Sequence, residues 1–311
     1  MHTRKLRQFV VVAEELHFSR AAAKLFIAQQ ALSRQIRELE DELGTPLFLR
    51  STRKVELTPA GTVFLESARA VLESFDRSVA LARRVGSTPV ATVRVGACVG
   101  GALELTAPIM NEFRERYPEV VLEWREHAVV DPSAGLVDGA SDIAIVRLPL
   151  SAEGIESVAL FNEPTVAIVA ITHRLAGRRS VVIGDLLEDP ITVSASGDDA
   201  FRAFWSLEAY RRGIPPKVVT IHSVTEEVQV VGTGAAIAVT AAATTRYGSH
   251  PSLRFLPVTD APPSTVALAW RTDTVGPLAR RFRKVALAVR DRETAILHSI
   301  EHPADLYPGH P

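Results

Sequence analysis

The chain has 311 residues, of which 47% are hydrophobic and 23% charged, and its formal net charge at pH 7 is −1. This composition is ordinary for a globular protein, and the length suggests two domains more readily than one. No apolar run reaches about 18 residues, which excludes a predicted transmembrane helix, and the single cysteine, Cys98, excludes an intrachain disulfide.

The amino-terminal stretch MHTRKLRQFVVVAEE has no signal-peptide cleavage site, so we expect it to belong to the folded protein. With one cysteine, the simplest setting is a reducing cytoplasm. The small net charge hides an asymmetry, because residues 1–58 hold ten Lys/Arg against seven Asp/Glu. That part is about +3, which is weak evidence for a polyanionic partner.

Three helices are predicted at the start of the chain. Apolar residues at helical spacing indicate a first helix over residues 3–15, and Ser19 is the predicted N-cap of a short second helix over residues 20–25. A third helix follows, because four apolar residues form one stripe and Gly44 is a good helix terminator. The stripe consists of Leu32, Ile36, Leu39 and Leu43.

A short basic hairpin and a long helix come next. Residues 47–50 and 54–57 read as two strands around a three-residue turn. Thr58 and Pro59 are a cap and a first-turn proline, which predict a helix of about 28 residues that ends at Gly86. That helix is too long for a small domain, and its apolar stripe indicates a partner helix.

Beyond residue 89 strands and helices alternate, which predicts an α/β domain with a mostly parallel sheet. Predicted strands cover residues 91–97, 120–126, 142–147, 165–171, 191–194, 217–222, 235–240 and 265–270. Predicted helices cover residues 102–116, 199–213, 224–233 and 277–299. The proline-rich residues 301–311 are expected to be a disordered tail.

The third predicted helix turns polar residues outward near its start. In a helix-turn-helix, that part of the helix enters the major groove, where Gln pairs with adenine, Arg pairs with guanine, and Ser reaches base or phosphate. The alternative is an ordinary solvated face. The candidate base contacts are Gln29, Gln30, Ser33, Arg34 and Arg37. Arg50, Arg53 and Lys54 around the hairpin tip suit phosphates or a narrow minor groove.

These residues carry a resemblance to the LysR-type transcriptional regulators. The matching segments are LRQFVVVAEELHFSRAAAKL, ALSRQIRELEDELGTPLFLR and ELTPAG, followed by FRERYPEV, SDIAIVR and VGTGAAIAV. The resemblance implies a winged helix-turn-helix (1–58), a linker and dimerisation helix (59–88) and a periplasmic-binding-protein-like α/β effector domain of two subdomains (89–300). It also implies a homodimer or tetramer on double-stranded promoter DNA. Ala28 stands where the family usually has serine and is a poor cap, so we expect the helix start to differ or to be less stable by roughly 1 kcal/mol.

The effector site is expected at the carboxyl ends of the strands, where three turns precede helix starts. Free N–H groups at such starts suit a carboxylate, and Arg147 could add a charge-assisted pair, so the sequence predicts a small organic anion. The structural alternatives are tight packing at the glycines, an ion pair of Arg147 and a structural role for His222. The candidate residues are Cys98, Val99, Gly100, Gly101, Arg147, Ser194, Ser196, His222 and Ser223.

Two other classes of protein were weighed. VRVGACVGGA lacks the G-x-G-x-x-G spacing of a dinucleotide loop, and the sequence has neither G-x-S-x-G nor metal-ligand spacing of His and Cys. We therefore expect no catalytic residues, no metal and no cofactor. A solute-binding protein would leave the first 88 residues unexplained.

Overall fold

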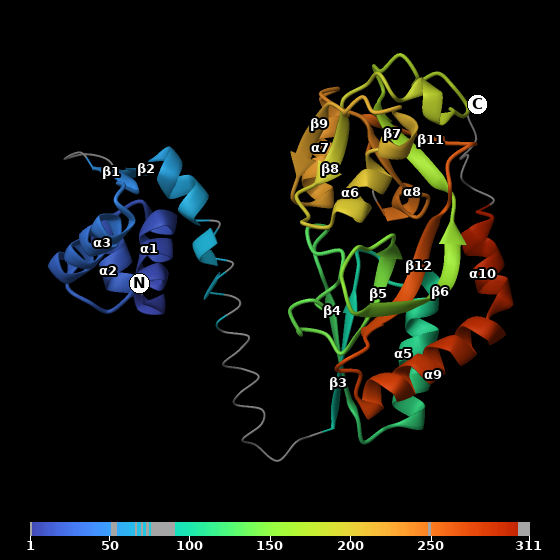
Figure 1. Ribbon diagram of the computed structural model, residues 1–311, viewed down its shortest axis with the longest axis horizontal. Coiled ribbons are helices and arrows are strands. Elements are labelled where there is room, and N and C mark those ends of the chain that lie inside the picture. The colour runs from blue at the N-terminus through green and yellow to red at the C-terminus, as the bar shows by residue number, and fades with distance from the viewer. Residues whose placement is uncertain are drawn as a thin grey trace. The chain divides into compact units, whose positions relative to one another are not determined.

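The structure is a computed structural model that describes residues 2–50, 55–65, 67–69, 71–72, 75, 91–247 and 250–303. The chain divides into two compact units, Met1–Pro89 and Val90–Pro311. Each unit has its own hydrophobic core, and each is described by itself (Figure 1).

The first unit is three helices and a two-stranded hairpin. Its elements are α1 (Thr3–Glu15), α2 (Phe18–Lys24), α3 (Gln29–Leu43), β1 (Phe48–Arg50) and β2 (Val55–Leu57). Phe9 lies at the centre, fully buried, with its ring 5.4 Å from that of Phe48 and 5.1 Å from that of Phe64. The predicted stripe on α3 faces this core through Leu32, Ile36 and Leu39.

The helix ends follow local chemistry. Gly44 closes α3 with a left-handed backbone (φ 67°), as predicted, and Ala28 begins it without a side-chain cap. The prediction that Ser19 caps the second helix was wrong, because α2 begins at Phe18 and the Nδ1 of His17 accepts from the backbone N–H of Arg20. Histidine supplies the acceptor two residues before the serine.

The helix predicted from Pro59 begins where expected. The Oγ1 of Thr58 accepts from the N–H of Gly61 at 2.9 Å and donates to the carbonyl of Pro46 at 2.8 Å. A side chain at Gly61 would lie 2.1 Å from the carbonyl oxygen of Leu47, so glycine is required there. Residues 59–65 are helical, whereas most of the predicted linker helix, from residue 76 onward, lies outside the described residues.

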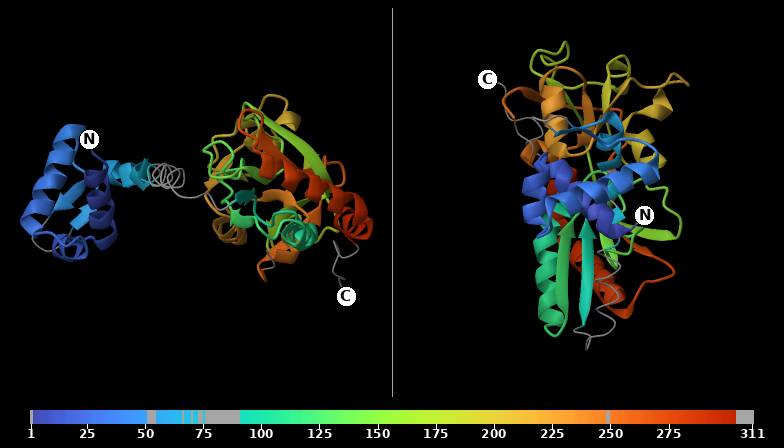
Figure 2. Two further views of the ribbon diagram at one scale, coloured as in Figure 1. Left: turned by 90° about the horizontal axis from the view of Figure 1, so that it is seen from below. Right: turned by 90° about the vertical axis from the view of Figure 1, so that its left-hand side faces the viewer.

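The second unit has two subdomains. The first contains a five-stranded sheet in the order β4-β3-β5-β12-β6. Its strands are β3 (Thr92–Ala97), β4 (Val121–Glu126), β5 (Ile143–Leu148), β6 (Ile155–Glu163) and β12 (Ser264–Arg271). Figure 2 shows β3 and β4 running side by side in its right-hand view.

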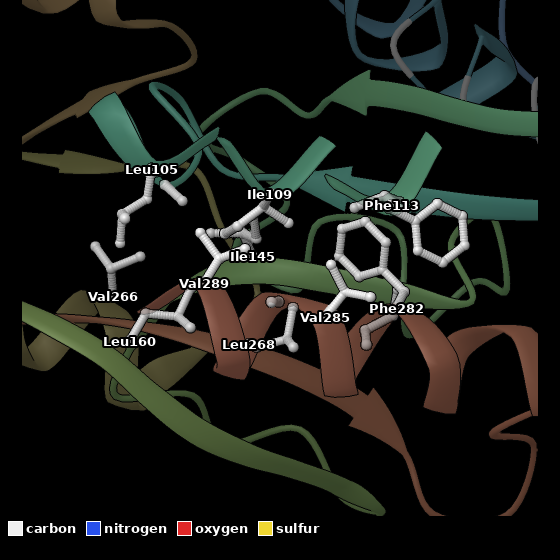
Figure 3. Packing of buried hydrophobic residues seen from close by; sticks show 14 of the residues in the cluster. Leu105, Ile109, Phe113, Ile145, Leu160, Val266, Leu268, Phe282, Val285 and Val289 are labelled. Atoms are coloured by element: carbon white, nitrogen blue, oxygen red, sulfur yellow. The ribbon is translucent and has the colours of Figure 1, made fainter. Parts of the chain in front are cut away.

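Three helices cover one face of that sheet: α5 (Thr106–Arg116), α9 (Pro277–Arg292) and α10 (Thr294–Glu301). Their apolar stripes meet alternate residues of the strands, because side chains alternate along a strand. Figure 3 shows Phe113 of α5 beside Phe282 of α9, with ring centroids 5.3 Å apart. Phe113, Phe282 and Leu268 of β12 are fully buried in one core.

The second subdomain is built from the chain between β6 and β12. Its strands are β7 (Thr165–Ala170), β8 (Ile191–Ser194), β9 (Val218–Ile221), β10 (Ala238–Ala241) and β11 (Leu253–Pro257). Its helices are α6 (Asp199–Trp205), α7 (Val224–Gly232) and the single turn α8 (Thr244–Tyr247). One sheet has the order β10-β7-β11, and β8 pairs with β9.

The expectation of a mostly parallel sheet was wrong. The pairs β3–β4, β3–β5 and β8–β9 are parallel, but β12 is antiparallel to both β5 and β6, and β7 is antiparallel to both of its neighbours. The cause is the connection between the subdomains. The chain leaves the first subdomain through β6 and returns through β12, so these two strands must run in opposite directions.

Three predicted helices are shorter than expected. The helix of residues 102–116 begins at Thr106 after a 3-10 turn, and that of residues 199–213 ends at Trp205. The helix of residues 277–299 is two helices, because the chain bends at Glu293 and α10 then packs against β6. Most of the predicted disordered tail, residues 304–311, lies outside the described residues.

Candidate functional site

The outward face of α3 carries the candidate base contacts. Gln29, Gln30, Arg34 and Arg37 are exposed, and Ser33 is half-buried. The Arg34 side chain is 76% exposed, and its only ion pair among the described residues is a long one, with Nε 3.8 Å from the carboxylate of Glu38. These donors are therefore free to meet an external partner.

Gln29 is held in place from the preceding helix. The hydroxyl of Ser19 donates to its Oε1 at 2.8 Å. A side chain fixed in this way loses less rotamer freedom when it binds a base edge. The predicted phosphate contacts cannot be placed in the same way, because Arg53, Lys54 and the side chain of Arg50 lie outside the described residues.

A cavity of about 620 Å³ lies between the two subdomains of the second unit. Its wall includes the turn after β3, the end of β5, the start of α7 and parts of β8 and β10. Of the predicted effector residues, Cys98, Val99, Gly100, Gly101, Arg147 and Ser194 line it. A cavity of this size fits a small organic molecule.

Arg147 is already paired within the protein. Its Nη1 lies 2.6 Å from Oε2 of Glu163, a carboxylate that is only 1% exposed, and also donates to the hydroxyl of Ser264 at 3.0 Å. The backbone N–H of Ala243 donates to the other oxygen of Glu163. The ion pair that the sequence offered as an alternative for Arg147 is thus present, and the arginine lines the cavity as well.

Three carboxylates line the same cavity. Glu126 accepts from the N–H of Gly100 at 3.2 Å, and Glu227 accepts from the hydroxyl of Thr192 at 2.7 Å. Burial raises the pKa of Glu227, and the bond from Thr192 offsets part of that rise. Among the described residues, no cationic side chain lies within 4.0 Å of the Glu227 carboxylate.

The third carboxylate, Asp131, accepts several hydrogen bonds. Burial acts to raise its pKa, but the bonds it accepts from His127, Ser133 and the N–H of Gly135 outweigh burial, so the pKa is lowered. The Nδ1 of His127 lies 3.0 Å from Oδ2 of Asp131, and His127 also lines the cavity.

Comparison with known proteins agrees in both units. Residues 3–62 match the family described as "Bacterial regulatory helix-turn-helix protein, lysR family", and residues 86–291 match "LysR substrate binding domain". The chain belongs to the LysR family. Its first unit thus carries the helix-turn-helix domain of that family, and the cavity lies in the substrate-binding domain.

Several relatives of this LysR-family protein are transcriptional regulators by name. It is 29% identical to HcaR, the Hca operon transcriptional activator of Escherichia coli, over 91% of this chain and 96% of HcaR. ShiR of Corynebacterium glutamicum is 35% identical over 77% of this chain and 82% of ShiR. With AlsR of Bacillus subtilis the identity is 35%, and the match spans 63% of this chain and 65% of AlsR.

Solved structures of full-length regulators have the same fold. BenM superposes with a TM-score of 0.53 at 28% identity, covering 94% of this chain and 98% of BenM. A C206 mutant of Corynebacterium glutamicum OxyR gives a TM-score of 0.52 at 26% identity, covering 95% of this chain and 92% of OxyR.

Three predicted effector residues of this LysR-family protein do not line the cavity. Ser196 is buried and its hydroxyl accepts from the N–H of Asp198, while Ser223 caps α7 by accepting from the N–H of Glu226. The His222 side chain is 61% exposed, on the outside of the same turn. All three belong to turns at the correct strand ends, but they bond locally.

Cys98 also lines the cavity. Burial raises its pKa, and the nearby charge of Arg147 lowers it by less. Because the thiolate is the reactive form, a raised pKa disfavours redox chemistry at this position.

The largest omission from the sequence prediction is Glu227. A signal existed, because this residue lies in the first turn of a predicted helix that follows a strand end, where side chains face the cleft. Other wall residues depend on the tertiary fold and were not predictable from local pattern: Trp124 and Thr192 lie on strands, and Phe201 and Trp205 lie on α6. In the described part of the chain, no cluster of three His, Cys, Asp or Glu residues could hold a metal, and no helix is both long and apolar enough to cross a bilayer.

Proposed function

We propose that this protein is a ligand-responsive transcriptional regulator in which α3 reads promoter DNA and a small molecule binds in the cavity of the second unit. The observation that carries the proposal is the presence, in one chain, of the family's helix-turn-helix with an exposed polar α3 face and a cavity of about 620 Å³. The names of its relatives support regulation and not catalysis. Such a protein works where the chromosome is, in the bacterial cytoplasm.

On the DNA side, Gln29, Gln30, Ser33, Arg34 and Arg37 would contact base edges. Arg50, Arg53 and Lys54 would contact phosphates, which contribute affinity without sequence preference. A helix from one chain reads one half-site, so a second copy is needed for a two-fold symmetric promoter site. We propose that the helix beginning at Pro59 supplies that dimer contact.

On the ligand side, the connections between the subdomains are the moving part. The chain crosses from one subdomain to the other between β6 and β7 and again between β11 and β12. A molecule that touches both walls favours the more closed arrangement, and this population shift is the signal that would reach the DNA-binding unit. Six predicted residues line the cavity, and we propose that they contact the ligand: Cys98, Val99, Gly100, Gly101, Arg147 and Ser194.

A footprint on the DNA directly upstream of the protein's own gene tests the proposal. We expect protection of a site with two half-sites about one helical turn apart, or a multiple of that distance. The same experiment with a ligand found by thermal stabilisation should change the protected length or the affinity. A protein that protects no segment of that region would overturn the proposed function.

A further inference from the structure

We propose that the ligand of the cavity presents a positively charged amine to Glu227, on a compact apolar body, and does not present a carboxylate to Arg147. The inference rests on the proposed function, because it names the class of molecule bound at that same cavity. It replaces the small organic anion expected from the sequence, and three features of the wall carry it.

The first feature is the charge balance. Arg147 is the only Lys or Arg side chain that lines the cavity in the described part of the chain. Its charge is matched at 2.6 Å by Glu163, which is buried and has no other cation within 4.0 Å among the described residues. An anionic ligand would have to compete with Glu163, and separating a buried ion pair leaves a carboxylate without a partner.

The second feature is that several of the backbone N–H groups at the predicted turns already have acceptors within the protein. After β3, the N–H of Gly100 donates to Glu126, that of Gly101 to the carbonyl of Cys98, and that of Ala102 to Thr106.

Two N–H groups around the helix start after β9 also have internal acceptors. The hydroxyl of Ser223 accepts from the N–H of Glu226, and the Glu226 carboxylate accepts from the N–H of His222. A carboxylate that bound these N–H groups would have to displace the internal acceptors.

The third feature is Glu227 itself. Its carboxyl group lines the cavity, and the only hydrogen bond that it makes to the described residues is with Thr192, through Oε1. An ammonium group bonded to the second oxygen would supply the missing charge and a donor. Burial raises the pKa of Glu227, so a cation beside it would recover the free energy that burial costs the ionised form.

The rest of the wall suits an aromatic or similarly compact body. Trp124 lies on one side, and Phe201 and Trp205 come from the second subdomain, with Val99 and Leu103 at the turn after β3. Mainly apolar walls with a small number of placed polar groups are typical of small-molecule sites. Aromatic faces also attract ammonium groups, which adds to the preference for a cation.

Two series of probes separate charge from shape. One is 2-phenylethylamine, 2-phenylethanol and 3-phenylpropionate, and the other is tryptamine, tryptophol and indole-3-propionate. Binding to the full chain is measured by calorimetry and by thermal melting at millimolar probe. We expect at least one amine to bind at least about tenfold more tightly than its matched carboxylate, with a rise in Tm of at least about 2 °C.

Glu227→Gln keeps the shape and removes the charge. We expect this variant to lose at least about tenfold in amine affinity, which corresponds to about 1.4 kcal/mol of binding free energy. Its affinity for the alcohol should stay unchanged. Glu226→Gln is the matched control, because Glu226 lies next to it on α7 outside the cavity. That control should bind the amine like the wild type.

The outcomes separate the two proposals. Tighter binding of a carboxylate, no binding by either amine, or unchanged amine affinity in Glu227→Gln would each overturn the amine proposal. If the upstream footprint persists in that case, the regulator proposal stands. Loss of the footprint in the wild-type protein would overturn the regulator proposal whatever the calorimetry shows.

Discussion

The outer face of α3 and the wall of the cavity both present polar side chains, and they differ in how those side chains are bonded. On α3, Arg34 is 76% exposed and its contact with Glu38 is 3.8 Å long. In the cavity, the Arg147 side chain is 13% exposed and lies 2.6 Å from Glu163. A surface that meets a polyanion can leave its donors in water, whereas buried groups must be satisfied within the protein.

The difference has an energetic consequence. Charged groups in water contribute little to folding, so the α3 face is free to serve binding alone. Polar groups in the cavity contribute to stability and to binding together, because a ligand must either join their bonds or replace them. Substitutions on the α3 face should therefore change binding without changing stability, whereas substitutions in the cavity should change both.

The largest expected effect is on the buried carboxylate. Glu163→Ala leaves Arg147 charged without its partner and removes the acceptor for the N–H of Ala243, so we expect a loss of about 3–5 kcal/mol in the free energy of unfolding. Urea denaturation measures this. Glu163→Gln keeps an acceptor and should lose less. A loss below about 1 kcal/mol in the alanine variant would mean that the pair of Arg147 and Glu163 contributes no more to stability than a surface ion pair.

The next largest effect is on DNA. Arg34→Ala should weaken binding to the specific site by about 1–3 kcal/mol, because a bidentate base contact is lost. Its free energy of unfolding should change by less than about 0.5 kcal/mol, since the side chain is exposed. Gel-shift titration and urea denaturation measure the two quantities. Arg179→Ala is the control, because Arg179 is an exposed arginine in the second unit. Equal losses of DNA affinity in both variants would count against base contacts by the outward face of α3.

A smaller effect is expected at the turn before α3. Phe26 is 95% exposed and has a left-handed backbone (φ 54°), which bulky side chains rarely adopt. Asparagine tolerates that conformation, so Phe26→Asn should stabilise the first unit by about 1 kcal/mol. Thermal melting measures it, with Phe26→Ala as the variant that removes the ring without relieving the backbone. A gain of the same size in both variants would assign the effect to the ring.

The smallest effect expected is a pH slope from the cavity. The folded pKa of Glu227 is raised above its ordinary value of 4.5, so the folded protein holds this proton more tightly than the unfolded chain does. Its contribution to stability is therefore fully present below that ordinary pKa and is lost as the pH rises through the folded pKa. In denaturation as a function of pH, the wild type should lose stability relative to Glu227→Gln as the pH rises through that window. A stability difference between the two proteins that stays constant across the window would mean that the carboxyl ionises at no cost in the folded protein.

The first unit was largely predictable because its contacts are local. The stripe Leu32, Ile36 and Leu39 defines α3, and Gly44 ends it, from residues within a few turns of one another. The error at Ser19 was also local, since His17, two residues earlier, caps the helix by accepting from the N–H of Arg20. The hydrogen bond from Ser19 to Gln29 could not be predicted from the sequence pattern, because it depends on the angle between two helices.

The second unit was predictable in its elements but less so in its directions and its wall. Strand β6 was missed because it lies at the sheet edge and most of its residues are polar or exposed. The antiparallel course of β12 depends on where the chain goes between residues 163 and 264. The position of Arg147 at the cavity was predicted from the end of its strand. Its partner Glu163 lies on β6, a strand that the sequence did not predict, so the pairing of the Arg147 charge could not be predicted either.

The course of β12 also governs the order in which the protein can fold during synthesis. This strand lies between β5 and β6, so their sheet stays open until residues 264–271 have left the ribosome. The second subdomain, by contrast, consists of residues that emerge earlier and pair among themselves. Because chains fold as their segments appear, we expect the second subdomain to form first in the nascent chain. The ligand cavity then becomes complete only when almost the whole polypeptide has been made.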